Sequence, residues 1–221
     1  MASHRILVAD DHEVVRRGLR VLLEAQPGWQ VCGEAVTGRE AVQKVRELKP
    51  DIVVLDITMP DLNGLEATRQ ILKTVPSTQV LILTVHDSDE VVHRVLCAGA
   101  RGYLLKSDAG HDLVAAVEAL SEHKAFFTPR VAERVLEGYL NGGNSRDKGA
   151  RTLEAVEALT QREREIIQLL AEGKSTKEVA AQLSISIHTA VTHRANIMRK
   201  LQLHSVSDLV RYAIRNNLAS L

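Results

Sequence analysis

Residues 51–64 read "DIVVLDITMPDLNG", and this stretch decides how the first half of the chain folds. Its apolar run, from Ile52 to Ile57, is typical of a strand that is buried on both faces of a parallel sheet. Asp56 interrupts the end of that run, although an unpaired carboxylate in a protein core is costly. The position of Asp56, a carboxylate at the carboxyl end of a buried strand, therefore needs a functional explanation.

Four other short apolar runs occur in residues 1–125, and helix-like segments separate them. The runs are "RILVA" (5–9), "WQVCGEAV" (29–36), "QVLILT" (79–84) and "GYLLK" (102–106). Alternation of strand and helix predicts an α/β domain, a five-stranded doubly wound parallel sheet with helices on both faces. In such open sheets, ligand sites lie beyond the carboxyl ends of the strands.

Polar side chains follow the strands at those carboxyl ends. The first strand ends in Asp10 and Asp11, the third in Asp56, the fourth in Thr84 and the fifth in Lys106. Neighbouring carboxylates repel each other and raise a pKa unless a cation is present. Hard oxygen donors with room for water suit Mg²⁺. The sequence therefore predicts a Mg²⁺ site at this edge, with Lys106 as a fixed positive charge.

Composition and spacing exclude several other classes of protein. The turn "ADDHEVV" after the first strand has no glycine, which argues against a dinucleotide site of the Rossmann type. Cys32 and Cys97 have no metal-ligand spacing, and a reducing cytosol suits them. No apolar run approaches the 18 residues of a membrane span. We therefore expect a soluble, cytoplasmic protein without membrane contact.

The second part of the chain has a different character. "TPRVAERVLEGYL" (128–140) predicts one more helix, and "NGGNSRDKGAR" (141–151) is the best candidate for a flexible linker. Beyond it, capping-box patterns and N-cap serines predict four helices and no strand, over residues 161–172, 176–183, 187–201 and 206–216. The expected parts are an α/β domain (1–125), an extra helix and linker (126–154), and an all-α four-helix domain (155–221).

The charge pattern predicts that the helical domain contacts a polyanion. Residues 151–221 carry ten Lys and Arg and seven Asp and Glu, a net charge of +3, whereas the other 150 residues carry −3. No acidic residue occurs over residues 179–207. On a helical wheel of residues 187–201, the packing stripe comprises Ile187, Ala190, Ile197, Met198 and Leu201. The opposite face is small, polar and basic, which suits a DNA major groove.

Residues 4–125 resemble the receiver domain of bacterial two-component response regulators. The resemblance rests on Asp10, Asp11, Asp56, Thr84, Tyr103 and Lys106, together with "MPDLNG". It implies that Asp56 accepts a phosphoryl group from a histidine kinase. It also implies Mg²⁺ held by Asp11, Asp56 and the Thr58 backbone carbonyl, with Asp10 acting through water. Thr84 and Tyr103 are implied as the switch pair, and the domain is expected to dephosphorylate itself without a separate substrate.

Residues 155–221 resemble the LuxR-type helix-turn-helix, so that the whole chain resembles a NarL/FixJ-type response regulator. The resemblance rests on "LTQREREIIQLLAEGKSTKEVAAQL" and the helix after it. It implies base contacts from Val191, Thr192 and Ala195, and phosphate contacts from His188, Asn196, Arg199 and Lys200. Val191 stands where the family often has a charged residue, which favours an apolar contact to a thymine methyl group. Part of the last helix is implied as a dimer contact on DNA.

These patterns predict a phosphorylation-controlled, DNA-binding transcription regulator that forms a homodimer when phosphorylated or bound to DNA. One alternative is a Mg²⁺-dependent aspartyl-phosphate phosphatase, but Thr58 stands where the second acid of such enzymes often occurs. Another is a receiver that acts through protein contacts only, and the acid-free helix argues against it. The opposite net charges also predict that the receiver covers the basic helix before phosphorylation.

Overall fold

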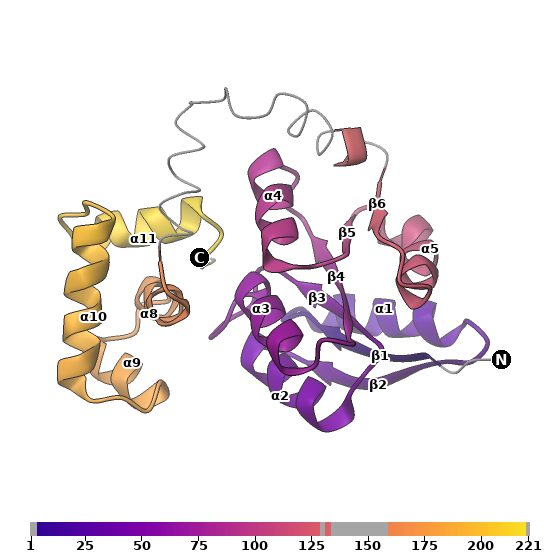
Figure 1. Ribbon diagram of the computed structural model, residues 1–221, viewed down its shortest axis with the longest axis horizontal. Coiled ribbons are helices and arrows are strands. Elements are labelled where there is room, and N and C mark those ends of the chain that lie inside the picture. The colour runs from indigo at the N-terminus through magenta and orange to yellow at the C-terminus, as the bar shows by residue number, and fades with distance from the viewer. Residues whose placement is uncertain (1–3, 129–130, 134–158, 220–221) are drawn as a thin grey trace.

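The computed structural model describes residues 4–128, 131–133 and 159–219. A parallel sheet forms the centre of the N-terminal domain, with strand order β2-β1-β3-β4-β5-β6 (Figure 1). The strands are β1 (His4–Ala9), β2 (Trp29–Ala35), β3 (Ile52–Asp56), β4 (Gln79–Thr84), β5 (Gly102–Leu105) and β6 (Phe126–Phe127). The strand that ends in Asp56 therefore lies between β1 and β4, where both of its edges are paired.

The sixth strand corrects the prediction of a five-stranded sheet. In β6, Phe126 pairs with Gly102 and Phe127 pairs with Tyr103, both in parallel register. A strand of two residues is too short to show the alternation from which strands are predicted. Its place at the edge of the sheet depends on the backbone of β5, which local sequence does not reveal.

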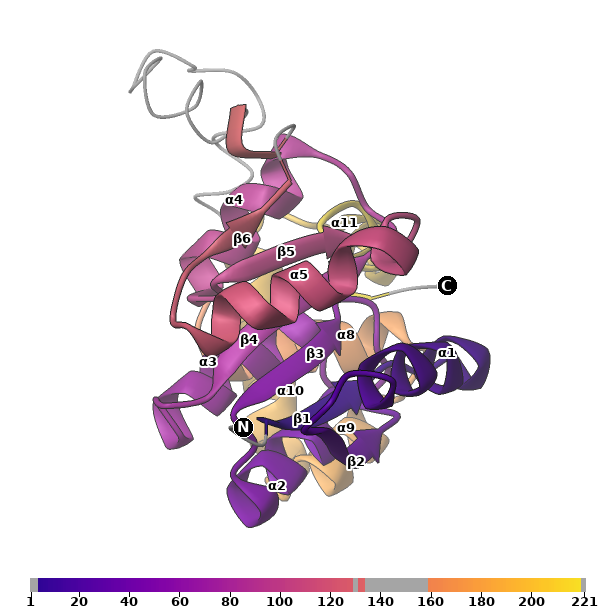
Figure 2. The ribbon, with the colours of Figure 1, turned by 90° about the vertical axis from the view of Figure 1, so that its right-hand side faces the viewer.

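Helices cover both faces of the sheet, as predicted. They are α1 (Glu13–Glu24), α2 (Gly38–Leu48), α3 (Gly64–Thr74), α4 (Asp89–Ala98) and α5 (Ala109–Ser121). α1 and α5 pack on one face, and α2, α3 and α4 pack on the other (Figure 2). Alternate residues of β3 contribute to the two cores, with Ile52 and Val54 in one and Val53 and Leu55 in the other. This double burial explains the continuous apolar run.

The C-terminal domain has the four predicted helices, α8 (Gln161–Ala171), α9 (Thr176–Gln182), α10 (Ile187–Lys200) and α11 (Val206–Arg215). Each begins at the predicted residue and ends one residue earlier. Complete capping boxes begin α8 at Thr160 and α9 at Ser175, and the side chains of Ser186 and Ser205 cap α10 and α11. These hydrogen bonds satisfy backbone N–H groups that a helix start leaves without partners.

The packing stripe of α10 is confirmed only in part. Ala190 and Ile197 are buried, and Met198 and Leu201 pack against the core that contains Ile197. Ile187, the first residue of α10, is 52% exposed and is therefore not part of the buried stripe. Arg194, on the same helix, donates a hydrogen bond to the Thr176 hydroxyl at the start of α9 (3.1 Å).

Most of the segment between the two domains lies outside the described residues. Residues 131–133 are helical and Val131 is buried, in agreement with the start of the predicted extra helix over 128–140. The rest of that helix and the predicted linker over 141–151 fall within residues 134–158, which the structure does not describe. Among the described residues, no helix has both the length and the apolar content needed to cross a bilayer.

Candidate functional site

A cluster of acidic side chains lies at the carboxyl edge of the sheet, where the sequence predicted it. Ligand atoms of Asp10, Asp11, His12 and Asp56 lie within 4.8 Å of one another. The clustering follows from the pairing of β1 with β3, which brings the two strand ends together. At Gly64 a Cβ atom would lie only 2.0 Å from the Asp56 carbonyl oxygen, so the start of α3 approaches the acceptor strand closely because that residue is glycine.

Lys106 joins the two buried carboxylates of this cluster. Its Nζ atom lies 2.7 Å from Asp10 Oδ2 and 2.9 Å from Asp56 Oδ2. Asp10 is fully buried and Asp56 is 3% exposed, whereas Asp11 stands at the surface. The ammonium group therefore compensates two carboxylates that the fold removes from water.

Burial dominates the electrostatics of Asp56. Its removal from water raises the pKa of the Asp56 carboxyl from 3.8 to about 6, although hydrogen bonding to Lys106 opposes the shift and the charge of Asp10 adds to it. For Lys106, burial alone lowers the pKa, but the hydrogen bonds to Asp10 and Asp56 outweigh burial and raise it. Two buried carboxylates thus share one ammonium group, and the remaining negative charge favours the binding of a cation.

This shift predicts that Asp56→Asn stabilises the metal-free protein above pH 7. A carboxyl whose pKa is raised on folding makes the fold less stable as the pH rises from about 4 to about 6, and the full penalty remains at higher pH. A difference of about two pKa units corresponds to roughly 3 kcal/mol. Urea unfolding in a chelator should show this gain at pH 7.5. The gain in stability should shrink below pH 6. Equal stability of the wild type and Asp56→Asn at pH 7.5 would contradict the raised pKa of Asp56.

The other predicted residues of the receiver lie around the cluster. Thr84 is buried at the end of β4, and Tyr103 is fully buried on β5. The Tyr103 hydroxyl donates a hydrogen bond to the backbone carbonyl of His86. Thr58 follows Asp56 by two residues, and its Oγ1 lies 3.3 Å from His86 Nε2. Tyr103 therefore already points inward, without a phosphoryl group.

His86 was missed by the sequence analysis, although it connects the switch pair to the loop after Asp56. Its backbone N–H donates to Thr84 Oγ1 (3.2 Å), its carbonyl accepts from Tyr103, and its ring contacts Thr58. Burial and the charge of Lys106 lower the pKa of the His86 ring. Its position two residues beyond Thr84 was the available signal. His12 was missed as well, and its Nδ1 lies 2.7 Å from Asp11 Oδ1.

The predicted DNA-contacting residues lie on α10, and most of them face solvent. Six members of the set are exposed, and we define five of them as the reading face, which are His188, Val191, Thr192, Ala195 and Arg199. The sixth is Lys200. Asn196 is half-buried and accepts a hydrogen bond from Arg199 (3.0 Å). Lys200 lies 2.8 Å from Glu163 on α8, so that its ammonium group already has a partner within the domain.

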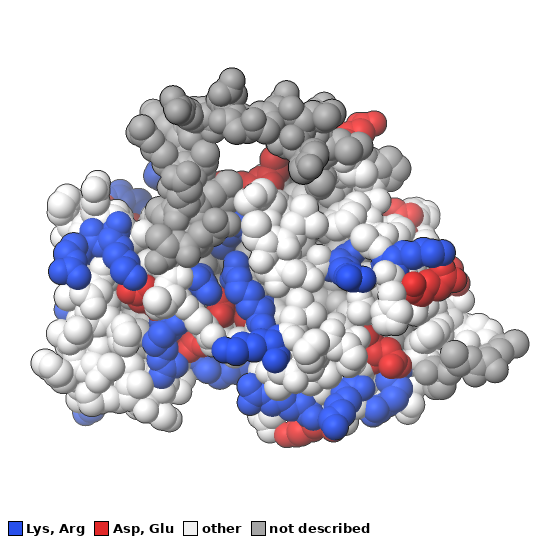
Figure 3. Space-filling model, in the orientation of Figure 1, with Lys and Arg blue, Asp and Glu red and all other residues white. Residues whose placement is uncertain are grey.

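The main part of the seam between the two domains is formed by α8 against α3 and the loop before α3, and further contacts come from the residues after α8, from α9 and from the end of α11. Arg164 Nε lies 2.7 Å from Glu66 Oε2, and Gln70 donates to Glu165 (3.0 Å). Figure 3 shows acidic and basic side chains gathered along this seam. α10 lies on the side of its domain away from the receiver (Figure 1), and Val191 is 43% exposed. The expectation that the receiver covers the basic helix is therefore wrong, because α8 supplies the contacts instead.

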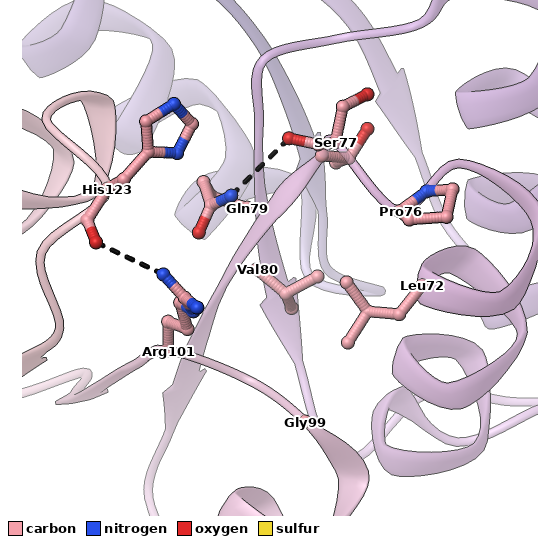
Figure 4. Close-up of a pocket in the computed structure, with 9 residues that line it drawn as sticks. Leu72, Pro76, Ser77, Gln79, Val80, Gly99, Arg101 and His123 are labelled. Carbon is pink, nitrogen blue, oxygen red and sulfur yellow. Dashed lines mark hydrogen bonds between the residues drawn. The ribbon is translucent and has the colours of Figure 1, made fainter.

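A separate hollow lies at the opposite edge of the sheet (Figure 4). It is lined by residues at the starts of β4 and β5, and Arg101 donates there to the backbone carbonyl of His123 (3.1 Å). The acidic cluster lies at the other end of these strands. This hollow is therefore distinct from the site predicted from the strand ends.

Two protein families match the chain over the two domains. The response regulator receiver domain matches residues 6–118, and the luxR family of bacterial regulatory proteins matches residues 157–213. The chain is a response regulator of the luxR family. Both resemblances drawn from the sequence are thereby confirmed. A receiver joined to a LuxR-type domain makes this regulator a phosphorylation-controlled, DNA-binding regulator of transcription.

Relatives of known name and structure match the chain over nearly its whole length or over a large part of it. The response regulator protein VraR of Staphylococcus aureus is 38% identical over 214 residues, which is 97% of this chain and 98% of VraR. RcsB of Salmonella enterica serovar Typhimurium, solved bound to promoter rprA with the phosphomimetic BeF₃⁻, has a TM-score of 0.61 and 27% identity over 95% of this chain and 98% of that one. A LuxR-family response regulator from Aurantimonas sp. SI85-9A1 has a TM-score of 0.60 and 38% identity, covering 63% of this chain and 99% of that one.

Proposed function

We propose that Asp56 is the phosphoryl acceptor of this regulator and that a histidine kinase is the donor. The observation that carries the proposal is a buried carboxylate at the tip of the central strand, held 2.9 Å from Lys106. A carboxylate oxygen of Asp56 forms a bond to phosphorus while the bond from phosphorus to the donor breaks, which leaves an acyl phosphate. A rigid strand holds the nucleophile in line, and positioning contributes much of the catalysis of phosphoryl transfer.

The donor set fits Mg²⁺ as the cofactor of this transfer. Asp10, Asp11 and Asp56 offer hard carboxylate oxygens within 4.8 Å, and Asp11 at the surface leaves room for water. We assign Asp11, Asp56 and the Thr58 backbone carbonyl as ligands, with Asp10 acting through water. When bound, the ion would neutralise charge on the phosphoryl oxygens. Lys106 contributes its fixed positive charge to the same oxygens, and loss of the acyl phosphate by hydrolysis would reset the regulator.

The readout of phosphorylation is proposed to pass through Thr84 and Tyr103. Thr84 is buried at the strand end beside the cluster, and its hydroxyl accepts a hydrogen bond from the backbone N–H of His86. A phosphoryl group adds a charge of about −1.5 to −2 and three acceptor oxygens. If Thr84 turns its hydroxyl to that group, the bond to His86 is lost and the β4–α4 loop changes. Tyr103 is already inward, so its hydrogen bond to His86 is proposed to stabilise the shifted loop.

The reading face of α10 is proposed to enter the major groove of double-stranded DNA. Val191, Thr192 and Ala195 would face bases, while His188, Asn196, Arg199 and Lys200 would approach or hold phosphates. The exposure of the reading face and the absence of acidic residues over 179–207 support this assignment. RcsB has been solved as dimers bound to DNA, which supports a homodimer of this regulator on DNA. We place its action in the cytoplasm.

Two substitutions on the reading face should separate base contacts from phosphate contacts. Thr192→Ala should relax sequence preference, at a cost of about 1–3 kcal/mol on specific DNA only. Arg199→Ala should weaken binding to all sequences alike and reduce the salt slope by about one. Lys200 is less suitable for this test, because it also pairs with Glu163. Titrations of specific and random duplexes at several salt concentrations measure both effects, and equal losses on both duplexes for both variants would contradict the assignment.

Incorporation of phosphate provides the direct test of the proposed acceptor. The full-length regulator should take up one phosphoryl group from acetyl phosphate when Mg²⁺ is present, and a chelator should prevent the uptake. Intact-mass spectrometry measures the uptake. Phosphorylated and unphosphorylated chains should then differ in affinity for their DNA site.

A further inference from the structure

The loop that follows Asp56 is held by side chains of the DNA-binding domain. We call residues 57–63 the acceptor loop. The side-chain amide of Gln168 on α8 binds this loop at two places, since its oxygen accepts from the backbone N–H of Asn63 (2.7 Å) and its nitrogen donates to the carbonyl of Met59 (2.9 Å). Gln168 is only 1% exposed. A buried amide that satisfies two backbone groups of a distant loop is a specific contact and not a chance surface approach.

Asp61, in the middle of the acceptor loop, is held by three more residues of the DNA-binding domain. Its backbone N–H donates to Glu172 Oε1 (3.0 Å), and its carboxylate accepts hydrogen bonds from Lys174 Nζ (2.6 Å) and Gln182 Nε2 (2.7 Å). Burial of Asp61 raises its pKa, but the bonds from Lys174 and Gln182 outweigh burial and lower it. Asp61 also has a φ of +67°, a left-handed conformation that few non-glycine residues adopt. The loop is thus fixed in one conformation along most of its length.

These contacts restrain the phosphoacceptor side of the molecule more than the DNA-binding side. The acceptor loop continues directly from Asp56 and includes Thr58, whose carbonyl is assigned to the cation. The reading face of α10 remains exposed while the contacts are made. Separation of the domains is therefore not required to uncover the reading face. It is required to release the acceptor loop, because hydrogen bonds tolerate only small changes in length and angle.

The rest of the described seam contains buried polar atoms without hydrogen-bond partners, which lowers the stability of this closed arrangement of the two domains relative to an open one in which the seam is separated. Arg94 on α4 is 3% exposed and donates to the backbone carbonyl of Asn216. Among the described residues, Arg94 Nε, the Tyr212 hydroxyl and Asn216 Oδ1 lack hydrogen-bond partners. Buried polar groups without partners are costly, and water would satisfy them on opening. A small change at the acceptor loop can therefore shift the balance between the two arrangements.

We propose that Gln168 and Lys174 are positioning residues that hold the acceptor loop in its unphosphorylated conformation, so that the DNA-binding domain opposes phosphorylation of its own receiver. The inference rests on the proposed role of Asp56. It also requires that the acceptor loop adjusts when a phosphoryl group and a cation bind, and the contacts of Gln168 and Lys174 would resist that adjustment. The apparent affinity for a phosphoryl group then equals the affinity of the open form multiplied by the fraction of molecules that are open. Linkage makes this effect reciprocal. If phosphorylation raises the affinity for DNA by a given factor, bound DNA favours the phosphorylated state by the same factor.

Beryllium fluoride with Mg²⁺, a phosphoryl mimic, provides an equilibrium test on the full-length chain. Fluorine NMR gives its apparent affinity, and acetyl phosphate labelling gives the initial rate in parallel. Lys174 is partly exposed, and Lys174→Ala removes one hydrogen-bond partner of Asp61. We expect this variant to bind beryllium fluoride about threefold more tightly and to be labelled faster by acetyl phosphate. Gln168→Ala removes both contacts to the backbone of the acceptor loop. We expect it to bind beryllium fluoride about tenfold more tightly, which corresponds to ~1.4 kcal/mol. A variant that merely damaged the fold would lose affinity and not gain it.

Matched variants complete the test. Lys177→Ala removes an exposed lysine three residues away and should behave as the wild type. Lys174→Arg retains the positive charge beside Asp61 and should restore most of the wild-type affinity. Unchanged or weaker binding by Lys174→Ala would overturn the proposal, even if Gln168→Ala failed to fold. Absence of binding and labelling in every chain, the wild type included, would instead overturn the role of Asp56 and this inference with it.

Discussion

We expect Asp56→Asn to abolish phosphate incorporation from acetyl phosphate, with labelling at least about 100-fold below that of the wild type. Asn retains the shape of the side chain but offers no anionic oxygen to attack phosphorus. Other carboxylates of the cluster do not replace it, because Asp10 is fully buried and Asp11 stands at the surface at the end of a different strand. Intact-mass spectrometry in the presence of Mg²⁺ measures the loss.

Two companion variants show whether the loss is local. Asp51→Asn changes an exposed aspartate that directly precedes β3, at the end of the strand opposite to Asp56. This variant should be labelled as the wild type is. Lys106→Ala should separate phosphorylation from its effect on DNA binding, because Lys106 contacts the acceptor directly. Full labelling of Asp56→Asn would show that another residue is the acceptor.

The second large effect is expected from Ala195→Glu on the reading face. A glutamate at this exposed position would bring a negative charge against the DNA, and juxtaposition of like charges at an interface costs several kcal/mol. We expect a loss in affinity of at least about 100-fold on specific DNA, which corresponds to ~2.7 kcal/mol. Ala and Glu are both good helix formers, so α10 should remain intact. Fluorescence anisotropy with a labelled duplex measures the loss.

The control for this substitution must add the same charge elsewhere. Gln43→Glu on α2 changes the net charge equally at an exposed position of the receiver. It should leave DNA affinity nearly unchanged, and both variants should still be phosphorylated. A comparable loss of affinity in both variants would indicate a general charge effect, whereas unchanged binding by Ala195→Glu would exclude Ala195 from the interface.

The sequence by itself determined the architecture of each domain and the composition of the cluster. Buried parallel strands leave a continuous apolar run, and their carboxyl ends share one edge, so the sequence alone predicted that Asp10, Asp56 and Lys106 lie close together. Helix starts were equally predictable, because capping depends on residues three apart, as with Thr160 and Glu163. These features are local, or follow from a rule that holds for all open parallel sheets.

Only the tertiary structure decided which residues meet across long distances along the chain. Gln168 lies in an apolar helical stretch with nothing to mark it, yet it contacts a loop more than 100 residues earlier. The strand β6 and the contact of His86 with Thr58 depend in the same way on backbone placement. Net charge suggested that the receiver would cover α10. The seam instead forms on α8, because contact between domains depends on shape and on individually paired polar groups, which net charge does not describe.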